Sequence, residues 1–194
     1  MVVTSSFTDR NELAAGSHTP INEHEIDGWM SNIELDWLRQ IARESEIIIE
    51  IGSYKGRSSR ALADNCIGRI YCIDPWDGVY YNDNGSINKY VRTDVYNDFY
   101  NNLQDHIVTG RVTPLKGFSH KFSFWKCADL VFIDGDHRYE MVKDDIERAK
   151  IWLKPHGILA GHDYNVKDWP SVKRAVDEIF PHVNTRDTIW WVQL

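Results

Sequence analysis

Residues 47–58 combine a short apolar run, Ile47–Ile49, with a carboxylate, Glu50, and two glycines, Gly52 and Gly56, before a helical pattern begins. This order predicts a strand, a tight turn and the N-terminus of a helix. Glycines at such a turn let the backbone approach a ligand closely, and the helix start offers unpaired N–H groups and a partial positive charge to a carboxylate or phosphate. The segment is therefore a candidate cofactor-binding turn of an α/β protein.

The glycine spacing distinguishes between cofactors. A dinucleotide fingerprint that starts at Gly52 requires glycines where this chain has Tyr54 and Arg57, and a phosphate-binding P-loop requires a lysine in place of Arg57. Neither motif is satisfied. The spacing instead resembles motif I of class I S-adenosylmethionine (SAM) dependent methyltransferases, in the version Glu-x-Gly-x-Tyr-x-Gly-x-Ser of small catechol-type O-methyltransferases.

Three further apolar runs also end in a carboxylate, at Asp74, Asp134 and Asp163. Asp74 lies about 20 residues after Gly52, where a Rossmann-like fold places the carboxylate that binds ribose hydroxyls. The segments 134–140 and 153–164 resemble one bacterial branch of class I enzymes, the Methyltransferase-24 family, and the likeness covers roughly residues 28–180. It implies an α/β, Rossmann-like fold with a seven-stranded, mostly parallel sheet of order 3-2-1-4-5-7-6, strand 7 antiparallel, and helices on both faces.

The resemblance also implies which residues contact the cofactor. The turn lies against the methionine part of SAM, Ser58 meets its carboxylate, Asp74 binds the ribose, Trp76 flanks the adenine, and Ser119 follows the third strand beside it. The full set expected to bind SAM is Glu50, Gly52, Ser53, Tyr54, Gly56, Ser58, Asp74, Trp76, Ser119 and Asp134.

Methyl transfer to oxygen requires removal of the acceptor's proton, by a general base or by a divalent cation that lowers the pKa of the hydroxyl. His137 is the candidate base, and Asp134 and Asp163 complete the expected catalytic group. The two aspartates match those that hold a metal in catechol-type enzymes, but Tyr164 stands where those enzymes have Asn. His162 is the candidate third ligand beside Asp134 and Asp163, for Mg²⁺ or, because imidazole is a softer ligand, Mn²⁺.

Composition bounds the remaining possibilities. The chain has 194 residues, 42% of them hydrophobic, with a net charge of −7 and three cysteines that form no Cys-x-x-Cys pair. We expect an N-terminal extension at 1–30, a candidate cap over the site, and a single methyltransferase domain at 31–194. The start shows no secretory signal, so a cytoplasmic protein with reduced cysteines is expected. Its partner is a small-molecule acceptor rather than a nucleic acid or membrane, and a homodimer stays open.

The periodic pattern predicts helices at 31–44, 57–65, 91–106, 139–153 and 172–180, and a terminal hairpin at 183–192. Residues 75–90 are dense in Asn, Asp and Gly but carry four aromatic side chains, which makes them a candidate lid or an aromatic surface loop.

Other interpretations remain open at this level. The leading hypothesis is a SAM-dependent O-methyltransferase, and the alternatives are an NAD-linked oxidoreductase and a non-catalytic SAM-binding protein. Asp74 also suits a turn cap, His137 a loop support, and His162 with Asp163 a polar pair without a metal.

Overall fold

The computed structural model describes residues 22–194 except 83 and 91–93. The helices are η1 (Glu23–Glu25), α1 (Asn32–Ala42), α2 (Arg57–Ala63), α3 (Val95–Asn102), α4 (Gln104–Val108), η2 (Ser119–Lys121), α5 (Tyr139–Trp152) and α6 (Pro170–Ile179). The strands are β1 (Ile47–Ile51), β2 (Arg69–Asp74), β3 (Val79–Tyr81), β4 (Ile87–Tyr90), β5 (Val112–Lys116), β6 (Ala128–Ile133), β7 (Leu153–Gly161), β8 (Asn184–Arg186) and β9 (Ile189–Gln193).

Seven strands form one sheet in the order β5-β2-β1-β6-β7-β9-β8. Numbered along the chain without the separate β3–β4 pair, this is the order 3-2-1-4-5-7-6 that the resemblance implied. Strand β9 runs antiparallel to both β7 and β8, whereas the other pairings are parallel. The expected fold is therefore confirmed, including the terminal hairpin.

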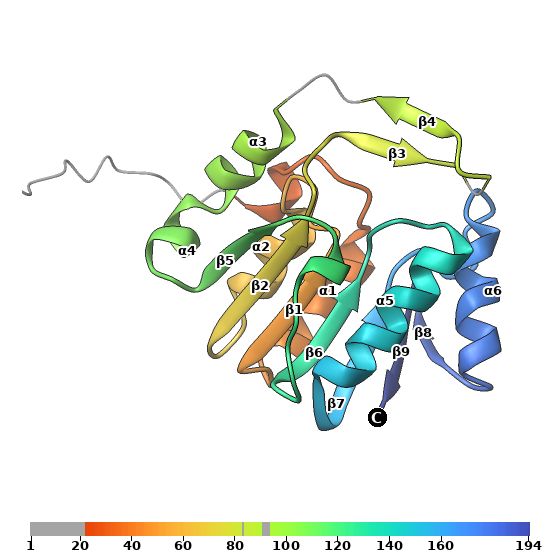
Figure 1. The fold of residues 1–194 in the computed structure, drawn as a ribbon. Helices are drawn as coiled ribbons and strands as arrows, with labels where there is room; N and C mark the ends of the chain where they lie inside the picture. The colour runs from red at the N-terminus through yellow and green to blue at the C-terminus, as the bar shows by residue number, and fades with distance from the viewer. Residues whose placement is uncertain (1–21, 83, 91–93) are drawn as a thin grey trace, which may run out of the picture.

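Helices cover both faces of the sheet (Figure 1). Residues of α1, α2 and α3 pack with Ile48, Ile70 and Leu130 on one face, and residues of α5 and α6 pack with Ile49, Val131 and Leu159 on the other. The central strands are apolar on both faces because parallel strands between two helical layers contact a core on each side. This sandwich leaves the strand ends as the place for polar chemistry.

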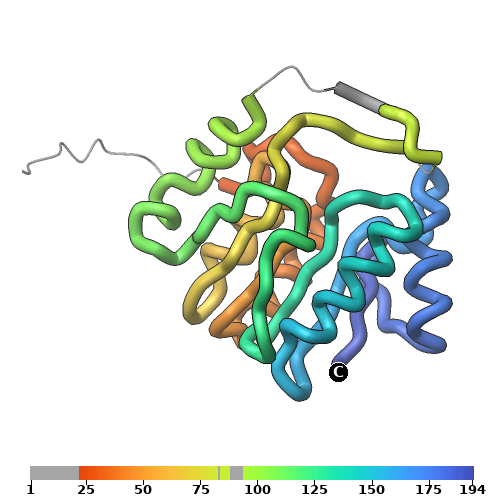
Figure 2. Tube along the Cα trace, in the orientation of Figure 1, coloured from red at the N-terminus to blue at the C-terminus, as the bar shows by residue number. Residues whose placement is uncertain are grey.

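Helix α1 begins as its sequence predicts. The side chain of Ser31 accepts a hydrogen bond from the N–H of Glu34, and the Glu34 carboxylate accepts one from the N–H of Ser31, which is a capping box. The tube view shows this helix on the opposite face of the sheet from α5 (Figure 2).

Two expectations for segments change, and a third is met within one residue. Residues 75–90 are not one irregular loop, because β3 and β4 pair as an antiparallel hairpin that crosses the carboxyl-end edge of the sheet (Figure 1). The expected helix at 91–106 is two helices, α3 and α4, which meet at Leu103. Helix α5 ends at Trp152, before Pro155, and β7 starts directly after it. Residues 1–21 of the expected extension lie outside the described residues.

None of the helices in the described part of the chain is long and apolar enough to span a membrane.

Candidate active site

A cavity of about 1110 Å³ opens at the carboxyl ends of β1, β2, β6 and β7, beneath the β3–β4 hairpin. Parallel sheets of this kind bind ligands at this edge, because the strand order reverses there and leaves a crevice. The predicted site residues that line the cavity are Gly52, Ser53, Tyr54, Ser58, Asp74, Trp76, Ser119, Asp134, His137, His162 and Asp163. Side chains from four separate strand ends thus share one cavity.

Gly52 lies where the two halves of this cavity meet, one at the ends of β1 and β2 and the other at the ends of β6 and β7. Its φ is +89°, and a Cβ atom on it would overlap the backbone carbonyl of Asp134. The backbone is tied on both sides, because Gly52 N–H donates to the carbonyl of Ile73 (2.8 Å) and Asp134 N–H donates to that of Ile51 (2.7 Å). Only glycine meets both conditions, a left-handed conformation and a backbone in direct contact.

Glu50 lies behind the turn rather than in the cavity. Its buried carboxylate accepts hydrogen bonds from the hydroxyls of Ser53 (2.6 Å), Ser58 (2.6 Å) and Ser59. Burial raises the pKa of Glu50 above its usual range. The structure thus places Glu50 as a support of the turn, where the sequence interpretation has a cofactor contact. Gly56 likewise packs against the side chains of Leu103 and Phe99 instead of lining the cavity.

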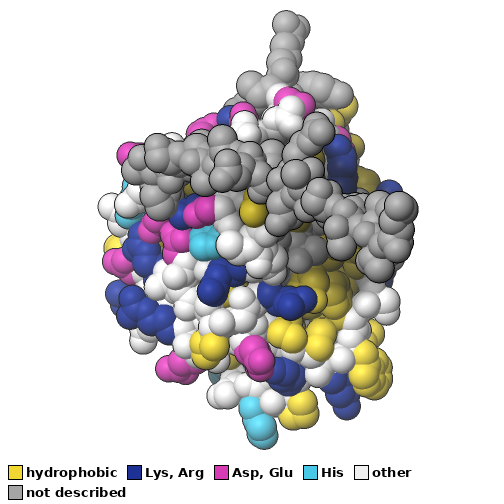
Figure 3. Space-filling view, turned by 90° about the vertical axis from the view of Figure 1, so that its left-hand side faces the viewer, with side chains coloured by type: hydrophobic (Ala, Val, Ile, Leu, Met, Phe, Trp, Pro, Cys, Tyr) yellow, Lys and Arg dark blue, Asp and Glu magenta, His cyan; other side chains and the backbone are white. Residues whose placement is uncertain are grey.

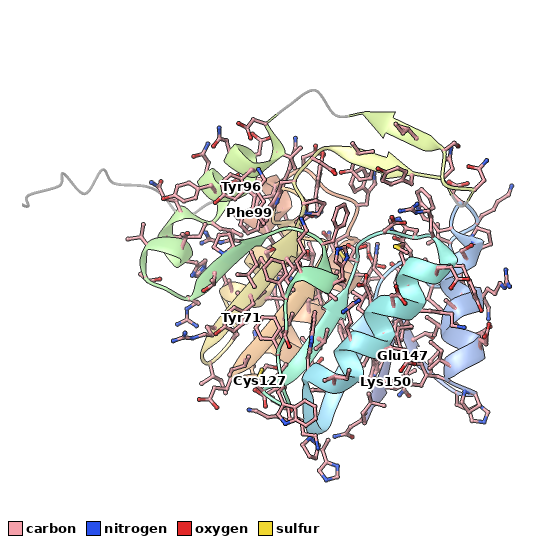
Figure 4. All side chains as sticks on the ribbon, viewed as in Figure 1. Tyr71, Tyr96, Phe99, Cys127, Glu147 and Lys150 are labelled. Atoms are coloured by element: carbon pink, nitrogen blue, oxygen red, sulfur yellow. The ribbon has the colours of Figure 1, made fainter. Side chains whose placement is uncertain are left out.

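Asp74 and Trp76 lie in the β2 corner, the turn that follows β2. The Asp74 carboxylate accepts from the N–H groups of Tyr54 (2.9 Å) and Trp76 (2.6 Å), so it caps this corner as well as facing the cavity. Burial raises the pKa of Asp74 to about 6. The indole of Trp76 donates to the carbonyl of Tyr54 (2.7 Å) and packs against Tyr96 and Phe99 of α3. Figure 4 labels these two α3 side chains.

Asp145 is a cavity residue that sequence reasoning missed. It lies on α5 and accepts a hydrogen bond from the hydroxyl of Ser119, and burial raises the pKa of Asp145 to about 6. The signal was present in the helix pattern, because Asp145 follows Val142 by three residues and therefore lies on the buried face. A carboxylate on the apolar face of an amphipathic helix indicates either a hydrogen bond inside the protein or a contact with a ligand.

Four side chains gather at the ends of β6 and β7. Nε2 of His137 lies 2.7 Å from Oδ2 of Asp163, and Nδ1 of His162 lies 3.3 Å from the same oxygen and 3.4 Å from Oδ1 of Asp134. Asp163 adopts a left-handed backbone conformation, with φ of +60°. Such backbone strain is held by the surrounding contacts and turns this carboxylate toward both imidazoles.

The pKa values in this cluster are shifted by the charges of neighbouring side chains. Burial alone would raise the pKa of Asp163, but contacts with His137 and His162 hold it well below its usual range. Burial alone would lower the pKa of both histidines, and the carboxylates around them raise it instead. The His137 ring also stacks on Trp169, with ring centres 4.4 Å apart, which fixes its plane. The two histidines therefore favour their charged forms in this cluster.

Glu34 completes the cluster from α1, and the sequence interpretation assigned it only to the capping box. It is buried, and its Oε1 lies 3.2 Å from Nε2 of His162. Burial would raise the pKa of Glu34, but His162 and the hydroxyl of Thr188 lower it to about 2.

The hairpin closes the cavity with aromatic side chains. Tyr80 of β3 packs against Tyr54 of the turn and Trp29 of the N-terminal segment, with ring centres 5.9 and 5.8 Å apart. Tyr81 receives the guanidinium of Arg138 over its ring at 4.5 Å. These contacts place aromatic faces on the side of the cavity opposite the strand ends.

Three side chains at the ends of β6 and β7 form a donor set for a divalent cation. Ligand atoms of Asp134, His162 and Asp163 lie within 4.8 Å of one another, close enough to surround one ion. The carboxylate of Glu34 on the far side of the imidazole matches the outer partner that a metal-bound histidine normally has. Tyr164 takes no part, because its hydroxyl donates to Asp177 (2.6 Å). The residues fit a cation with one nitrogen and two carboxylate ligands, a set suited to Mn²⁺ better than to Mg²⁺.

Fold and site together define a Rossmann-like enzyme domain with a glycine turn beside a histidine–aspartate cluster. The family model Methyltransf_24, described as a methyltransferase domain, matches residues 49–164, which is more than half of the chain. The chain belongs to this family of methyltransferase domains. A search of curated proteins found no match.

Solved structures with this fold include several methyltransferases. A putative O-methyltransferase from Klebsiella pneumoniae is 15% identical, with a TM-score of 0.65 over 89% of this chain and 86% of that one. An O-methyltransferase from Bacillus cereus in complex with SAH is 16% identical, with a TM-score of 0.60 over 85% and 82%. The O-methyltransferase TomG from Streptomyces achromogenes, in complex with SAM, is 15% identical, with a TM-score of 0.59 over 84% and 80%. At these identities the likeness establishes the shared fold.

Proposed function

We propose that this methyltransferase binds SAM along the Gly52 turn and transfers its methyl group to a hydroxyl oxygen of a small molecule, with His137 as the base. The observation that carries the proposal is the shared cavity: the cofactor turn and the His137–Asp163 pair face the same space. SAM-bound and SAH-bound neighbours of the same fold support the choice of cofactor.

The cofactor's sulfonium supplies an activated methyl group, so the chain's own task is to position and deprotonate the acceptor. Gly52 allows close approach of the backbone, and Asp74 keeps free lone pairs for ribose hydroxyls beside its two N–H donors. Ser119 and Asp145 offer polar contacts to the adenine ring of SAM. His137 acts in its neutral form, which becomes more abundant as the pH rises. As the C–O bond forms and the C–S bond breaks, its Nδ1 takes the hydroxyl proton, and Asp163, 2.7 Å from Nε2, stabilises the resulting imidazolium.

A divalent cation, where one is bound, would be held by Asp134, Asp163 and Nδ1 of His162, and would lower the pKa of the acceptor hydroxyl.

The organisation proposed here is one catalytic domain at 31–194, with the segment before it forming part of the site. Trp29 and Met30 line the cavity, which supports a capping role for that segment. On the face shown in Figure 3, the described Lys and Arg side chains lie among Asp and Glu rather than in one basic patch. This mixture, with the net charge of −7, favours a small-molecule acceptor over a nucleic acid. A homodimer is compatible with the proposal.

Calorimetric titration with SAM, and separately with NADH, tests the proposal, each with and without Mn²⁺. We expect saturable SAM binding without an NADH response. A screen of hydroxylated acceptors with methyl-labelled SAM should then give turnover that His137→Ala abolishes. Binding of NADH in preference to SAM would refute the proposal, and SAM binding without turnover on any acceptor class would favour a non-catalytic SAM-binding protein.

A further inference from the structure

The carboxylate of Glu34 is buried although the capping box alone would leave it at the surface. Glu34 is 2% exposed, and three hydrogen bonds hold it. Its Oε2 accepts from the N–H of Ser31 (2.7 Å), and its Oε1 accepts from both the N–H (3.1 Å) and the hydroxyl (2.6 Å) of Thr188. A buried carboxylate is costly unless donors compensate it, so its retention here calls for a role beyond the helix cap.

The fourth contact of this carboxylate is with His162. Its Nε2 atom is buried, lies 3.2 Å from Oε1 of Glu34, and makes an ion-pair contact there without the alignment of a hydrogen bond. The opposite nitrogen, Nδ1, lies between Asp134 and Asp163. Glu34 therefore attracts the Nε2–H edge of the ring and leaves Nδ1 for the two aspartates.

We propose that Glu34 is a positioning residue that acts through His162: it fixes the direction of the imidazole, so that Nδ1 faces Asp134 and Asp163 at the reacting end of the cavity. The inference rests on the proposed function, because it concerns the same cluster. Glu34 brings α1 and the turn between β8 and β9 into contact with that cluster, since Ser31 and Thr188 hold its two oxygens.

A consequence follows for His137. Asp163 contacts both imidazoles through the same oxygen, Oδ2. If His162 turns its ring, that oxygen loses a partner and is free to move away from His137. Loss of Glu34 should therefore slow methyl transfer without weakening the binding of SAM, because the Gly52 turn and Asp74 are untouched.

The variant Glu34→Gln keeps the size of the side chain and removes its charge. The deciding measurement is the ring-nitrogen NMR spectrum of the ¹⁵N-histidine-labelled protein, with His162 assigned from the spectrum of His162→Gln. In the wild type we expect one set of His162 signals with an Nε2-bound proton protected from exchange. In Glu34→Gln that proton should exchange freely and the two nitrogen signals should shift.

The matched control is Ser31→Ala, which removes a hydroxyl next to Glu34 and keeps the carboxylate with its bonds to Thr188 and to the backbone N–H at position 31. It should leave the His162 signals unchanged. With the acceptor from the screen, Glu34→Gln should lose about 10- to 100-fold in kcat, in the range of outer partners that orient an active-site histidine, at unchanged SAM affinity.

Unchanged His162 signals in a folded Glu34→Gln protein would overturn the inference, and so would equal shifts in Ser31→Ala. Should Glu34→Gln not fold, Glu34→Asp, which keeps the charge and withdraws it from Nε2, replaces it with the same expected loss of the protected proton. The NMR result does not depend on SAM, so a wild type that fails to bind SAM refutes the proposed function alone.

Discussion

The two halves of the cavity hold their carboxylates in different ways. At the ends of β1 and β2, Glu50 and Asp74 accept hydrogen bonds from serine hydroxyls and backbone N–H groups, and burial raises their pKa values. At the ends of β6 and β7, Asp134 and Asp163 contact imidazoles instead; the pKa of Asp163 is lowered in spite of burial, whereas burial keeps that of Asp134 raised. Neutral donors fix geometry, whereas charged partners stabilise ionised forms and move protons. Under the proposed function, the first half would bind SAM and the second would carry out the reaction.

The largest expected effect is that of His137→Ala on the second half. Removal of a general base lowers kcat by about 10²- to 10⁴-fold, and SAM affinity should stay unchanged because the ring lies away from the Gly52 turn. Labelled-methyl transfer and calorimetry measure the two quantities. His182→Ala, at an exposed histidine, is the control and should leave both at wild-type values. A His137→Ala enzyme with normal kcat would contradict the division into halves.

Gly52→Ala should damage both halves together, because Gly52 contacts the backbone of Asp134. We expect a loss of about 3 kcal/mol or more in the free energy of unfolding, from overlap added to left-handed strain. Urea unfolding measures it. Gly110→Ala is the matched control: its φ is +76°, but a Cβ would meet nothing within 4 Å, so strain alone should cost about 1–2 kcal/mol. Equal losses in the two variants would show that the backbone contact is unimportant.

Asp74→Asn should affect only the first half, with about a tenfold loss of SAM affinity and little change in kcat. In the wild type, SAM affinity should fall as the pH drops through about 6, because a protonated Asp74 accepts ribose hydroxyls less well. Calorimetry from pH 5 to 8, on both proteins, measures this. Asp74→Asn should lose this fall in affinity. If the variant shows a fall of full size, another group than Asp74 titrates there.

The same raised pKa has the opposite effect on folding. The folded protein holds the Asp74 proton up to about pH 6, whereas the unfolded chain releases it near 3.8. This contribution to stability is therefore present at low pH and lost as the pH rises from about 4 to 6. The difference between wild type and Asp74→Asn in urea unfolding should change over that window.

The smallest expected effect is that of Ser31→Ala, which removes the helix cap and leaves the carboxylates of both halves in place. Loss of a serine cap costs about 1 kcal/mol of stability, and neither kcat nor SAM affinity should change. Thermal unfolding and the two assays measure the three quantities. A large loss of kcat would mean that the cap itself, rather than Glu34, holds His162.

The sequence predicted the fold and the ends of the strands well because both depend on short-range patterns. The apolar run before Glu50, the glycine at 52 and the capping box at Ser31 are set within a few residues, and the structure has each of them. The β3–β4 hairpin was missed because its Asn, Asp and Gly content masks two short strands that pair only with each other.

What the sequence alone determined is the fold family, the glycine turn after β1 and the residues that end each central strand. Only the tertiary structure decided that Glu50 supports the turn from behind, that Asp145 faces Ser119, and that Glu34 reaches His162. Thr188, which holds Glu34 in place, is distant from it along the chain, and the two meet because α1 and the β8–β9 hairpin lie at the same edge of the sheet. Local patterns follow from the chemistry of neighbouring residues, whereas partners of buried charges are set by packing between distant elements.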